Sequence, residues 1–148
     1  LNQISSKWAK EVFGSYNNAT FKIDYPVDNI YFNKSKIKKD IKTIIFLGGS
    51  QGSKAINTFA LKVARQLDKK GIKIIHQVGI THEKYMIDEY AKIGINVDCF
   101  GFTNKLLEKL EQSDFAVCRA GASTVWELVA LSIPALYIPY PFAASNHQ

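Results

Sequence analysis

Short apolar segments alternate along this chain with longer segments of helical periodicity, and this alternation limits the possible folds more than any other feature. The apolar segments predict strands at 20–25, 43–47, 73–77, 96–100, 115–118 and 135–138. Strands that alternate with helices form βαβ units, which build a parallel sheet. The segment Thr43-Ile44-Ile45-Phe46-Leu47 is apolar on both faces, as expected where helices cover both sides of a sheet. The sequence therefore predicts an α/β fold with a Rossmann-like, doubly wound parallel sheet.

Four helices are predicted between these strands, at 53–69, 81–92, 104–112 and 123–131. Their apolar residues recur at the spacing of one helix face, most clearly in the first of the four. A further amphipathic helix is predicted from Leu1 to about Gly14, with Ile4, Trp8 and Val12 on its apolar face. That face must pack on something. The sequence leaves open whether it packs on this domain or on a neighbouring one.

Length and charge exclude several classes of protein. The 148 residues fit one compact domain, and no run of about 18 apolar residues predicts a membrane-spanning helix. We expect no signal peptide, because Leu1 to Lys10 mix polar and apolar residues. A net charge of +6 would suit nucleic acid or an anionic membrane. However, the only dense cluster, Lys34, Lys36, Lys38 and Lys39, has no interleaved aromatic residues. We expect a solvated loop there and no nucleic-acid partner; the alternative is attraction of an anionic ligand or lipid surface.

The two cysteines, Cys99 and Cys118, each lie in a predicted strand and lack the spacing of metal ligands. We expect buried, reduced thiols, no metal site and a cytoplasmic protein. The chain does not begin with Met and stops on polar residues without a closing element. These features lead us to expect a piece of a longer protein.

The loop Gly48-Gly49-Ser50-Gln51-Gly52-Ser53 directly follows a predicted strand and opens the best predicted helix. Glycines let a backbone approach a ligand closely, and a helix start offers free N–H groups to phosphate. The spacing matches neither the dinucleotide fingerprint nor a Walker A loop. The sequence therefore favours phosphate binding here, against the alternative of a tight turn with Ser53 as helix cap.

A second strand-to-helix junction is Cys118-Arg119-Ala120-Gly121-Ala122-Ser123-Thr124-Val125-Trp126-Glu127. Its small residues leave room for a ligand at another helix start. Glu127 is expected in the first turn, where its carboxylate can accept two hydrogen bonds from the hydroxyls of a ribose. The alternative is a capping box, because Thr124 and Glu127 have the spacing of that motif.

The histidines offer little sign of catalysis. His76 is expected to be a satisfied structural residue at a strand end, and His82 has no triad partner at a recognisable spacing. His147 is a weak candidate for a general base, because it lies among the last polar residues without a partner in sequence. The acidic pairs Asp88/Glu89 and Glu108/Glu111 are expected on solvated helix faces, and no pair of carboxylates suggests a hydrolase.

Several motifs occur together in a fixed order. They are Gly48-Gly49-Ser50-Gln51-Gly52, His76-Gln77-x-Gly79, Cys118 to Glu127 as above, Pro134-Ala135, and Pro139-x-Pro141 followed by Gln148. Together they closely resemble the MurG family, the undecaprenyl-diphospho-muramoylpentapeptide β-N-acetylglucosaminyltransferases of peptidoglycan synthesis. The resemblance covers nearly the whole chain, from about Trp8 to Gln148.

This resemblance implies one half of a GT-B fold, in which two Rossmann-like domains face each other across a cleft. Residues 19–148 would be the UDP-sugar-binding C-terminal domain, truncated at its end, and residues 1–18 the tail of an absent N-terminal domain. Members of the family are inverting hexosyltransferases. They move N-acetylglucosamine from UDP-N-acetylglucosamine to lipid I and so make lipid II. They work at the cytoplasmic face of the cell membrane as peripheral proteins, serve cell shape and division, and use no metal or cofactor.

The resemblance also implies a set of UDP-N-acetylglucosamine-binding residues: Ser50, Gln51, Phe102, Thr103, Ala122, Ser123, Thr124, Val125, Trp126, Glu127 and Gln148. Ser50 would contact the diphosphate, the backbone of Thr103 the uracil, Glu127 the ribose and Gln148 the sugar hydroxyls. No catalytic residue is implied within this chain, because the family's proposed general base and lipid I site belong to the N-terminal domain. The fragment alone would bind UDP weakly and catalyse nothing.

Two departures and two alternatives remain. Tyr25-Pro26-Val27-Asp28 stands where the family often has Asn-Pro-Val-Arg, so the arginine near the uracil is absent, and His147 replaces a frequent glutamine. One alternative is another GT-B UDP-sugar transferase with a different lipid acceptor. The other is the nucleotide-binding module of an epimerase or oxidoreductase. An oxidoreductase should show a Gly-x-Gly-x-x-Gly loop, which this chain lacks.

Overall fold

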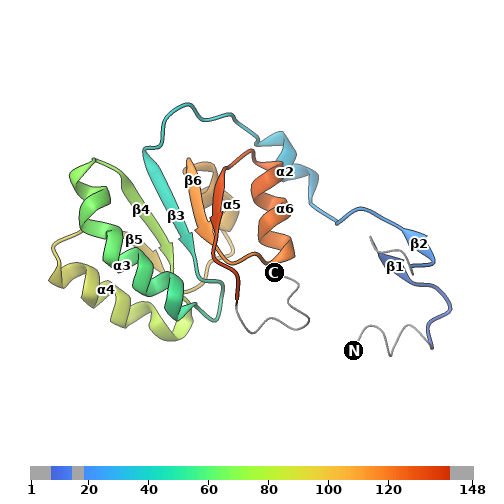
Figure 1. Cartoon of the computed structure of the whole chain (residues 1–148), viewed down its shortest axis with the longest axis horizontal. Coiled ribbons are helices and arrows are strands. Elements are labelled where there is room, and N and C mark those ends of the chain that lie inside the picture. The colour runs from blue at the N-terminus through green and yellow to red at the C-terminus, as the bar shows by residue number, and fades with distance from the viewer. Residues whose placement is uncertain (1–7, 15–18, 141–148) are drawn as a thin grey trace.

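The computed structural model describes residues 8–14 and 19–140 (Figure 1). Its elements follow in chain order: β1 (Phe13–Gly14), β2 (Phe21–Lys22), α2 (Asn29–Asn33), β3 (Thr43–Leu47), α3 (Lys54–Lys69), β4 (Lys73–Gln77), η1 (Ile80–His82), α4 (Glu83–Lys92), β5 (Asp98–Phe100), α5 (Leu106–Glu111), β6 (Phe115–Cys118), α6 (Ala122–Ala130) and β7 (Ala135–Tyr137). Three predicted strands, β3, β4 and β6, are confirmed at both ends. The predicted helix 81–92 divides into the 3-10 turn η1 and α4.

Within the described residues, the main sheet has five strands in the order β5-β4-β3-β6-β7, and every neighbouring pair is parallel. The chain first builds outward from β3 through β4 to β5, and then crosses back to β6 on the other side of β3. The point between β3 and β6 is therefore a topological switch point, where doubly wound sheets bind their ligands beyond the carboxyl ends of the strands. The predicted doubly wound sheet is confirmed.

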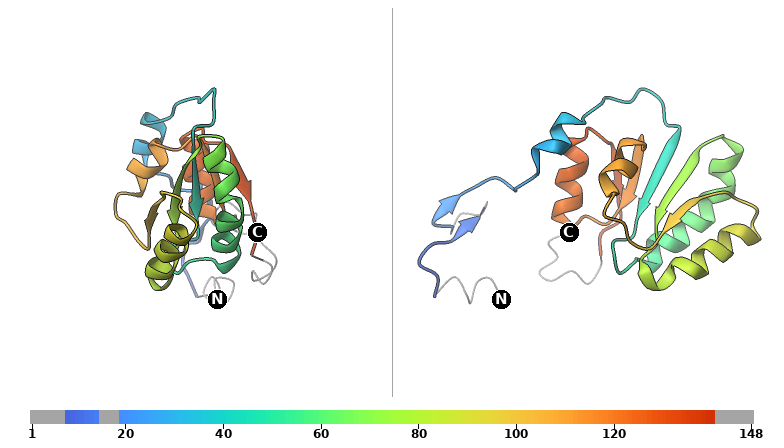
Figure 2. Two further views of the ribbon diagram at one scale, coloured as in Figure 1. Left: turned by 90° about the vertical axis from the view of Figure 1, so that its left-hand side faces the viewer. Right: turned by 180° about the vertical axis from the view of Figure 1, so that it is seen from behind.

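Helices cover both faces of this sheet, as Figure 2 shows. One face packs against α3 and α4 through Phe46, with Ile56 and Ala60 of α3 among the fully buried residues. The other packs against α5 and α6 through Ile45, together with Leu110 of α5 and Leu128 of α6. Neighbouring residues of β3 thus serve opposite cores, which explains why this strand is apolar on both faces.

The start of the chain differs from the prediction. Residues 8–14, expected as the end of an amphipathic helix, are not helical; they lead into β1, which pairs in parallel with β2. The rings of Phe13 and Phe21 stack across this pair at 5.2 Å between centroids, while Trp8 is 88% exposed. The two strands form an arm that extends away from the main sheet (Figures 1 and 2). Residues 1–7, which hold Leu1 and Ile4, lie outside the described part.

The short helix α2 was not predicted, although its start carries a recognisable signal. Asp28 is the N-cap, and its Oδ1 accepts a hydrogen bond of 3.0 Å from the N–H of Ile30. The residue that departs from the MurG-like pattern therefore has a local structural role. The helix packs beside α6, where Tyr31 joins the core beneath it.

The lysine cluster lies in the loop that precedes β3, at the opposite end of the strand from the glycine loop. Lys34 pairs with Glu111 at 3.0 Å, and Lys38 pairs with Asp114 at 3.2 Å. Asp114 also accepts hydrogen bonds of 2.9 Å from the N–H groups of Lys42 and Thr43. These contacts favour a structural role for this lysine loop at the amino end of the sheet.

Both cysteines are free; Cys118 is buried as predicted, but Cys99 is only partly buried. Over residues 8–14 and 19–140, no His, Cys, Asp or Glu side chains gather in a group of three that could hold a metal ion. In the same residues, no helix combines the length and apolar character needed to cross a membrane.

Candidate nucleotide site at the carboxyl edge of the sheet

Two strand-to-helix junctions leave the sheet side by side at the switch point. Leu47, the last residue of β3, lies opposite Cys118, the last residue of β6. The glycine loop follows the first strand, and residues 119–121 follow the second. A third loop, with Phe102 and Thr103, follows β5 two strands further along. Because all these strands are parallel, the three loops share one edge of the sheet, with β5 and β6 roughly 14 Å apart at ordinary strand spacing.

The glycine loop takes a path that requires glycine. Gly49 has φ 78° and Gly52 has φ 80°, a region that L side chains rarely adopt. At Gly48 a Cβ atom would lie 2.8 Å from the carbonyl oxygen of Gln77. At Gly52 a Cβ would overlap the carbonyl oxygen of Val78. The three glycines therefore allow the loop to lie directly on the exit of β4.

This loop also leaves donors available. The N–H of Gly48 is held by Gln77, and the N–H of Gly52 by Gly49. By contrast, the N–H groups of Ser50 and Gln51 have no hydrogen-bond partner within the described residues, and both side chains are exposed. The predicted cap is also present, because Ser53 accepts from the N–H of Ile56 at 3.5 Å. The loop is thus both a helix cap and a source of free amides at a helix start.

The second junction starts α6 without a side-chain cap. Gly121 is the N-cap and Ala122 the first helical residue, so the first amides of the helix have no capping side chain. This start excludes the predicted capping box, which would need Thr124 as the N-cap. The expectation that Glu127 lies in the first turn is also wrong, because it is the sixth residue of the helix. The observed helix, Ala122–Ala130, begins one residue before the predicted start at Ser123.

Glu127 is half-buried against α2 rather than free in solvent. The Tyr31 hydroxyl of α2 is near enough to this carboxylate to influence its pKa. Burial raises the pKa of Glu127 above its ordinary value of 4.5, and the hydrogen bond from Tyr31 opposes that rise. The carboxylate therefore has the Tyr31 hydroxyl as a neighbouring donor and retains further acceptor capacity.

The face of α6 near its start contacts the segment that precedes α2. The Tyr25 hydroxyl lies 2.6 Å from the Ser123 hydroxyl, and the Tyr25 ring stacks on Trp126 at 6.4 Å between centroids. Two of the predicted binding residues, Ser123 and Trp126, thus already have protein partners. Tyr25 lies in the tetrapeptide that departs from the MurG-like pattern.

The third loop is packed closely beneath its exposed tip. A Cβ at Gly101 would lie 2.7 Å from Oε2 of Glu83, so this position is tight. Phe102 beyond it is 62% exposed, and the Thr103 hydroxyl accepts from the N–H of Lys105 at 3.0 Å. The backbone of residues 102–103 is thus held at the carboxyl edge, where a flat ligand group could reach it.

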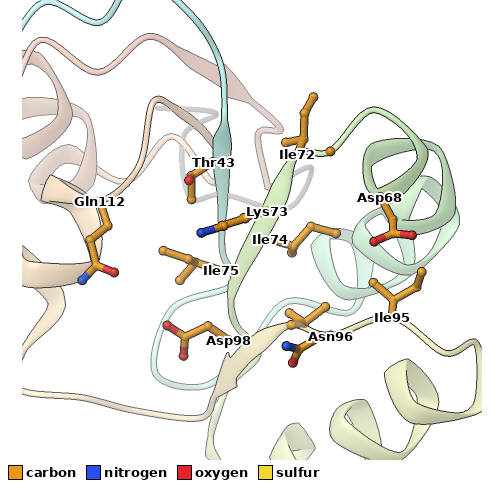
Figure 3. Close-up of a pocket in the computed structure, with 12 residues that line it drawn as sticks. Thr43, Asp68, Ile72, Lys73, Ile74, Ile75, Ile95, Asn96, Asp98 and Gln112 are labelled. Atoms are coloured by element: carbon orange, nitrogen blue, oxygen red, sulfur yellow. The ribbon is translucent and has the colours of Figure 1, made fainter.

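Two hollows mark opposite ends of the sheet. One, of about 920 Å³, lies beside Gly52 and Ser53 and extends to Arg119 and residues 138–140. The other, of about 710 Å³, lies at the amino ends of β3 and β4, beside Lys73 and Asn96 (Figure 3). Doubly wound sheets bind ligands at the carboxyl edge, so the first hollow adjoins the candidate site and the second does not.

Sequence reasoning missed three residues that shape this edge. Arg119 donates through Nη1 to the carbonyls of Ile138 and Pro139, at 3.0 and 2.8 Å, and so fastens the exit of β7. Tyr31 and Asn57 were also missed, because their partners come from distant parts of the chain. The predicted sugar contact Gln148 lies outside the described residues, as does His147.

Comparison with known proteins places the chain among glycosyltransferases. Residues 43–148 match the family described as "Glycosyltransferase family 28 C-terminal domain". Over all its residues, the chain is 45% identical to a protein of a Sulfurovum species and 49% identical to one of a Nitratiruptor species. Both relatives are named UDP-N-acetylglucosamine–N-acetylmuramyl-(pentapeptide) pyrophosphoryl-undecaprenol N-acetylglucosamine transferase.

A solved structure agrees with this. The crystal structure of Acinetobacter baumannii MurG matches 99% of the chain with a TM-score of 0.68 and 25% sequence identity. The chain covers 44% of that protein, and 44% of each of the two relatives. It therefore spans less than half the length of the proteins it resembles.

Proposed function

The chain belongs to the glycosyltransferase family 28 C-terminal domains, and from this premise we propose that it is the donor-binding part of an N-acetylglucosaminyltransferase. The donor would be UDP-N-acetylglucosamine, and the acceptor the N-acetylmuramyl-(pentapeptide) pyrophosphoryl-undecaprenol named for the relatives. The observation that carries the proposal is the pair of neighbouring helix starts at the switch point of the sheet. Free amides there suit a diphosphate.

Most of the predicted binding residues have a proposed role. The amides and hydroxyl of the Ser50-Gln51 turn would bind the diphosphate, with the uncapped start of α6 on its other side. The backbone of residues 102–103 would contact the uracil. The half-buried carboxylate of Glu127 would accept hydrogen bonds from the ribose. Gln148 would contact the sugar, as the resemblance implies.

The uncapped amides also suit the chemistry of transfer. When the sugar leaves, UDP takes up negative charge at the diphosphate. Fixed N–H donors and the positive ends of α3 and α6 would stabilise that charge as it develops. The acceptor hydroxyl needs a base, which we assign to the part of the full-length protein outside this chain.

We assign residues 19–148 to the donor-binding domain and residues 1–18 to the connection with the rest of the enzyme. The main five-stranded sheet and the described helices all lie within residues 19–148, which supports the first assignment, while the β1–β2 arm spans the boundary between the two parts. A lipid-linked acceptor supports work at a membrane surface, and the MurG resemblance adds that the full-length enzyme would be a peripheral protein on the cytoplasmic side. The acceptor would be held by the other domain.

Calorimetric titration of the full-length protein with UDP-N-acetylglucosamine, UDP-glucose and NAD tests this proposal. We expect the N-acetylglucosamine nucleotide to bind most tightly, and transfer of labelled N-acetylglucosamine to the lipid-linked acceptor. Equal or tighter binding of NAD would favour an oxidoreductase module instead. Transfer to a diacylglycerol acceptor alone would support another lipid glycosyltransferase.

A further inference from the structure

A buried polar cluster lies beneath the glycine loop, formed by His76 of β4, Asn57 of α3 and Tyr90 of α4. The exposed fractions of these residues are 0%, 4% and 2%. Nε2 of His76 lies 3.2 Å from Oδ1 of Asn57, and Nδ1 lies 2.7 Å from the Tyr90 hydroxyl. Because all three are buried, none of them is among the residues proposed to contact the nucleotide.

The direction of these hydrogen bonds follows from the amide of Asn57. Its Nδ2 donates to the carbonyl oxygen of Val78 at 3.1 Å, so its Oδ1 must be an acceptor. His76 therefore carries its proton on Nε2 and accepts from Tyr90 at Nδ1. Burial lowers the pKa of His76 to about 3, which keeps the ring in this neutral form.

Asn57 connects this cluster to the glycine loop. The carbonyl of Val78, which its amide holds, is the group against which Gly52 packs. Oδ1 of the same side chain lies 3.4 Å from the position of a Cβ at Gly48. The loop is further tied to this region by the hydrogen bond from the N–H of Ile80 to the carbonyl of Ser50, at 3.1 Å. The Asn57 side chain thus lies beside the beginning of the loop and holds the Val78 carbonyl that supports its end.

We propose that His76 is a positioning residue for diphosphate binding, which acts by orienting the Asn57 amide. The inference rests on the proposed function, since it assigns a support to the same site. Without the Nε2–H donor, the buried Asn57 oxygen loses its partner, and the Asn57 side chain is then held only through its bond to the Val78 carbonyl. The Val78 carbonyl and the loop above it then lose their fixed place. Binding amides must be held to within about 0.5 Å to be effective.

The test is calorimetry on the full-length protein with two probes, UDP and uridine. For His76→Phe we expect UDP to bind roughly ten-fold more weakly and uridine to change less than about two-fold. His76→Gln should restore UDP binding, because its amide can donate to Asn57 while its carbonyl accepts from Tyr90. Ser113→Ala, which removes a buried hydroxyl that donates to the carbonyl of Lys109 at 2.8 Å, is the control for a general loss of stability. It should leave UDP binding unchanged.

The outcomes separate the inference from the proposed function. If the unsubstituted protein does not bind UDP, both are overturned. If it binds UDP, but folded His76→Phe binds UDP equally well or loses UDP and uridine affinity alike, only the positioning role is overturned. Circular dichroism establishes folding. Should His76→Phe fail to fold, Asn57→Ser takes its place, and we again expect UDP binding to weaken roughly ten-fold and uridine binding to change less than about two-fold. Unchanged UDP binding, or equal losses of UDP and uridine binding, would overturn the positioning role.

Discussion

Leu47 lies directly opposite Cys118 across the β3–β6 pair, so the two strands leave the sheet at the same level. The helices that follow then turn to opposite faces, α3 into the core that contains Phe46 and α6 into the core that contains Ile45. Two helix starts are therefore brought to one place by strand register alone. The candidate diphosphate site is a consequence of topology, and the loop residues adapt it to a ligand.

The fit of Gly52 predicts a specific loss of stability and binding. Gly52→Ala places a Cβ against the Val78 carbonyl at φ 80°, and we expect the free energy of unfolding to fall by about 2–3 kcal/mol. UDP binding should weaken as well. Gly71→Ala is the matched control, because φ is 68° there but no atom lies within 4 Å of the Cβ. Urea denaturation of both variants checks this; equal losses would show that steric fit at Gly52 has no special role.

The role proposed for Glu127 predicts selectivity for the nucleoside part of the ligand. Glu127→Ala should weaken UDP binding by about 1.5–3 kcal/mol, the scale of hydrogen bonds to a charged group, and leave the binding of inorganic diphosphate nearly unchanged. Glu89→Ala, which removes the partly buried glutamate that pairs with Lys92 on α4, away from the candidate site, is the control. Competition calorimetry measures both ligands. Equal loss of UDP and diphosphate binding would remove Glu127 from ribose recognition.

The raised pKa of Glu127 also predicts a pH dependence of binding. Its carboxyl takes up a proton at a pH above its ordinary pKa of 4.5, and a protonated carboxyl loses acceptor capacity toward the ribose. As the pH is lowered, UDP affinity should therefore begin to fall at a higher pH than the titration of an ordinary glutamate predicts. The additional fall should be missing in Glu127→Gln. A parallel fall in both proteins would assign it to the ligand or to another group.

Asp114 predicts how stability depends on pH. Burial raises its pKa, but hydrogen bonds from Lys42 N–H, Lys38 and Thr43 N–H outweigh burial, and the folded pKa lies below the ordinary 3.8. Because the folded pKa is depressed, the stabilisation is present above pH 3.8 and is lost as pH falls through the folded value. Asp114→Asn should cost about 1–3 kcal/mol at neutral pH and flatten this acid loss. Urea denaturation from about pH 7 to about pH 2 checks it, with exposed Asp40→Asn as control. If Asp114→Asn lost as much free energy of unfolding at acid pH as the unsubstituted protein, this assignment would be contradicted.

The main sheet could be predicted from sequence because its signals are local. An apolar run such as 43–47 identifies a strand without knowledge of its neighbours. The glycine loop was also predictable, since three glycines between a strand and a helix imply a close backbone approach. The structure confirms that the loop lies at the carboxyl edge, and its ligand remains a proposal.

The failures occurred where distant contacts decide the structure. Trp8 and Val12 have helical spacing, yet residues 8–14 are not helical, and β1 pairs with β2. The capping-box pattern of Thr124 and Glu127 is present in the sequence, but α6 starts at Ala122 and the carboxylate meets Tyr31. Contacts between separate segments thus override both local patterns, the helical spacing and the capping-box spacing.

Amide chemical shifts on titration with UDP-N-acetylglucosamine test the two-junction site most directly. We predict that the largest changes occur at Gly49 to Gly52 and at Ala122 to Thr124, with a smaller set at residues 102–103. The hollow at the amino ends of the strands, beside Lys73 and Asn96, should show none (Figure 3). Largest changes in that hollow, with both helix starts unaffected, would contradict the account.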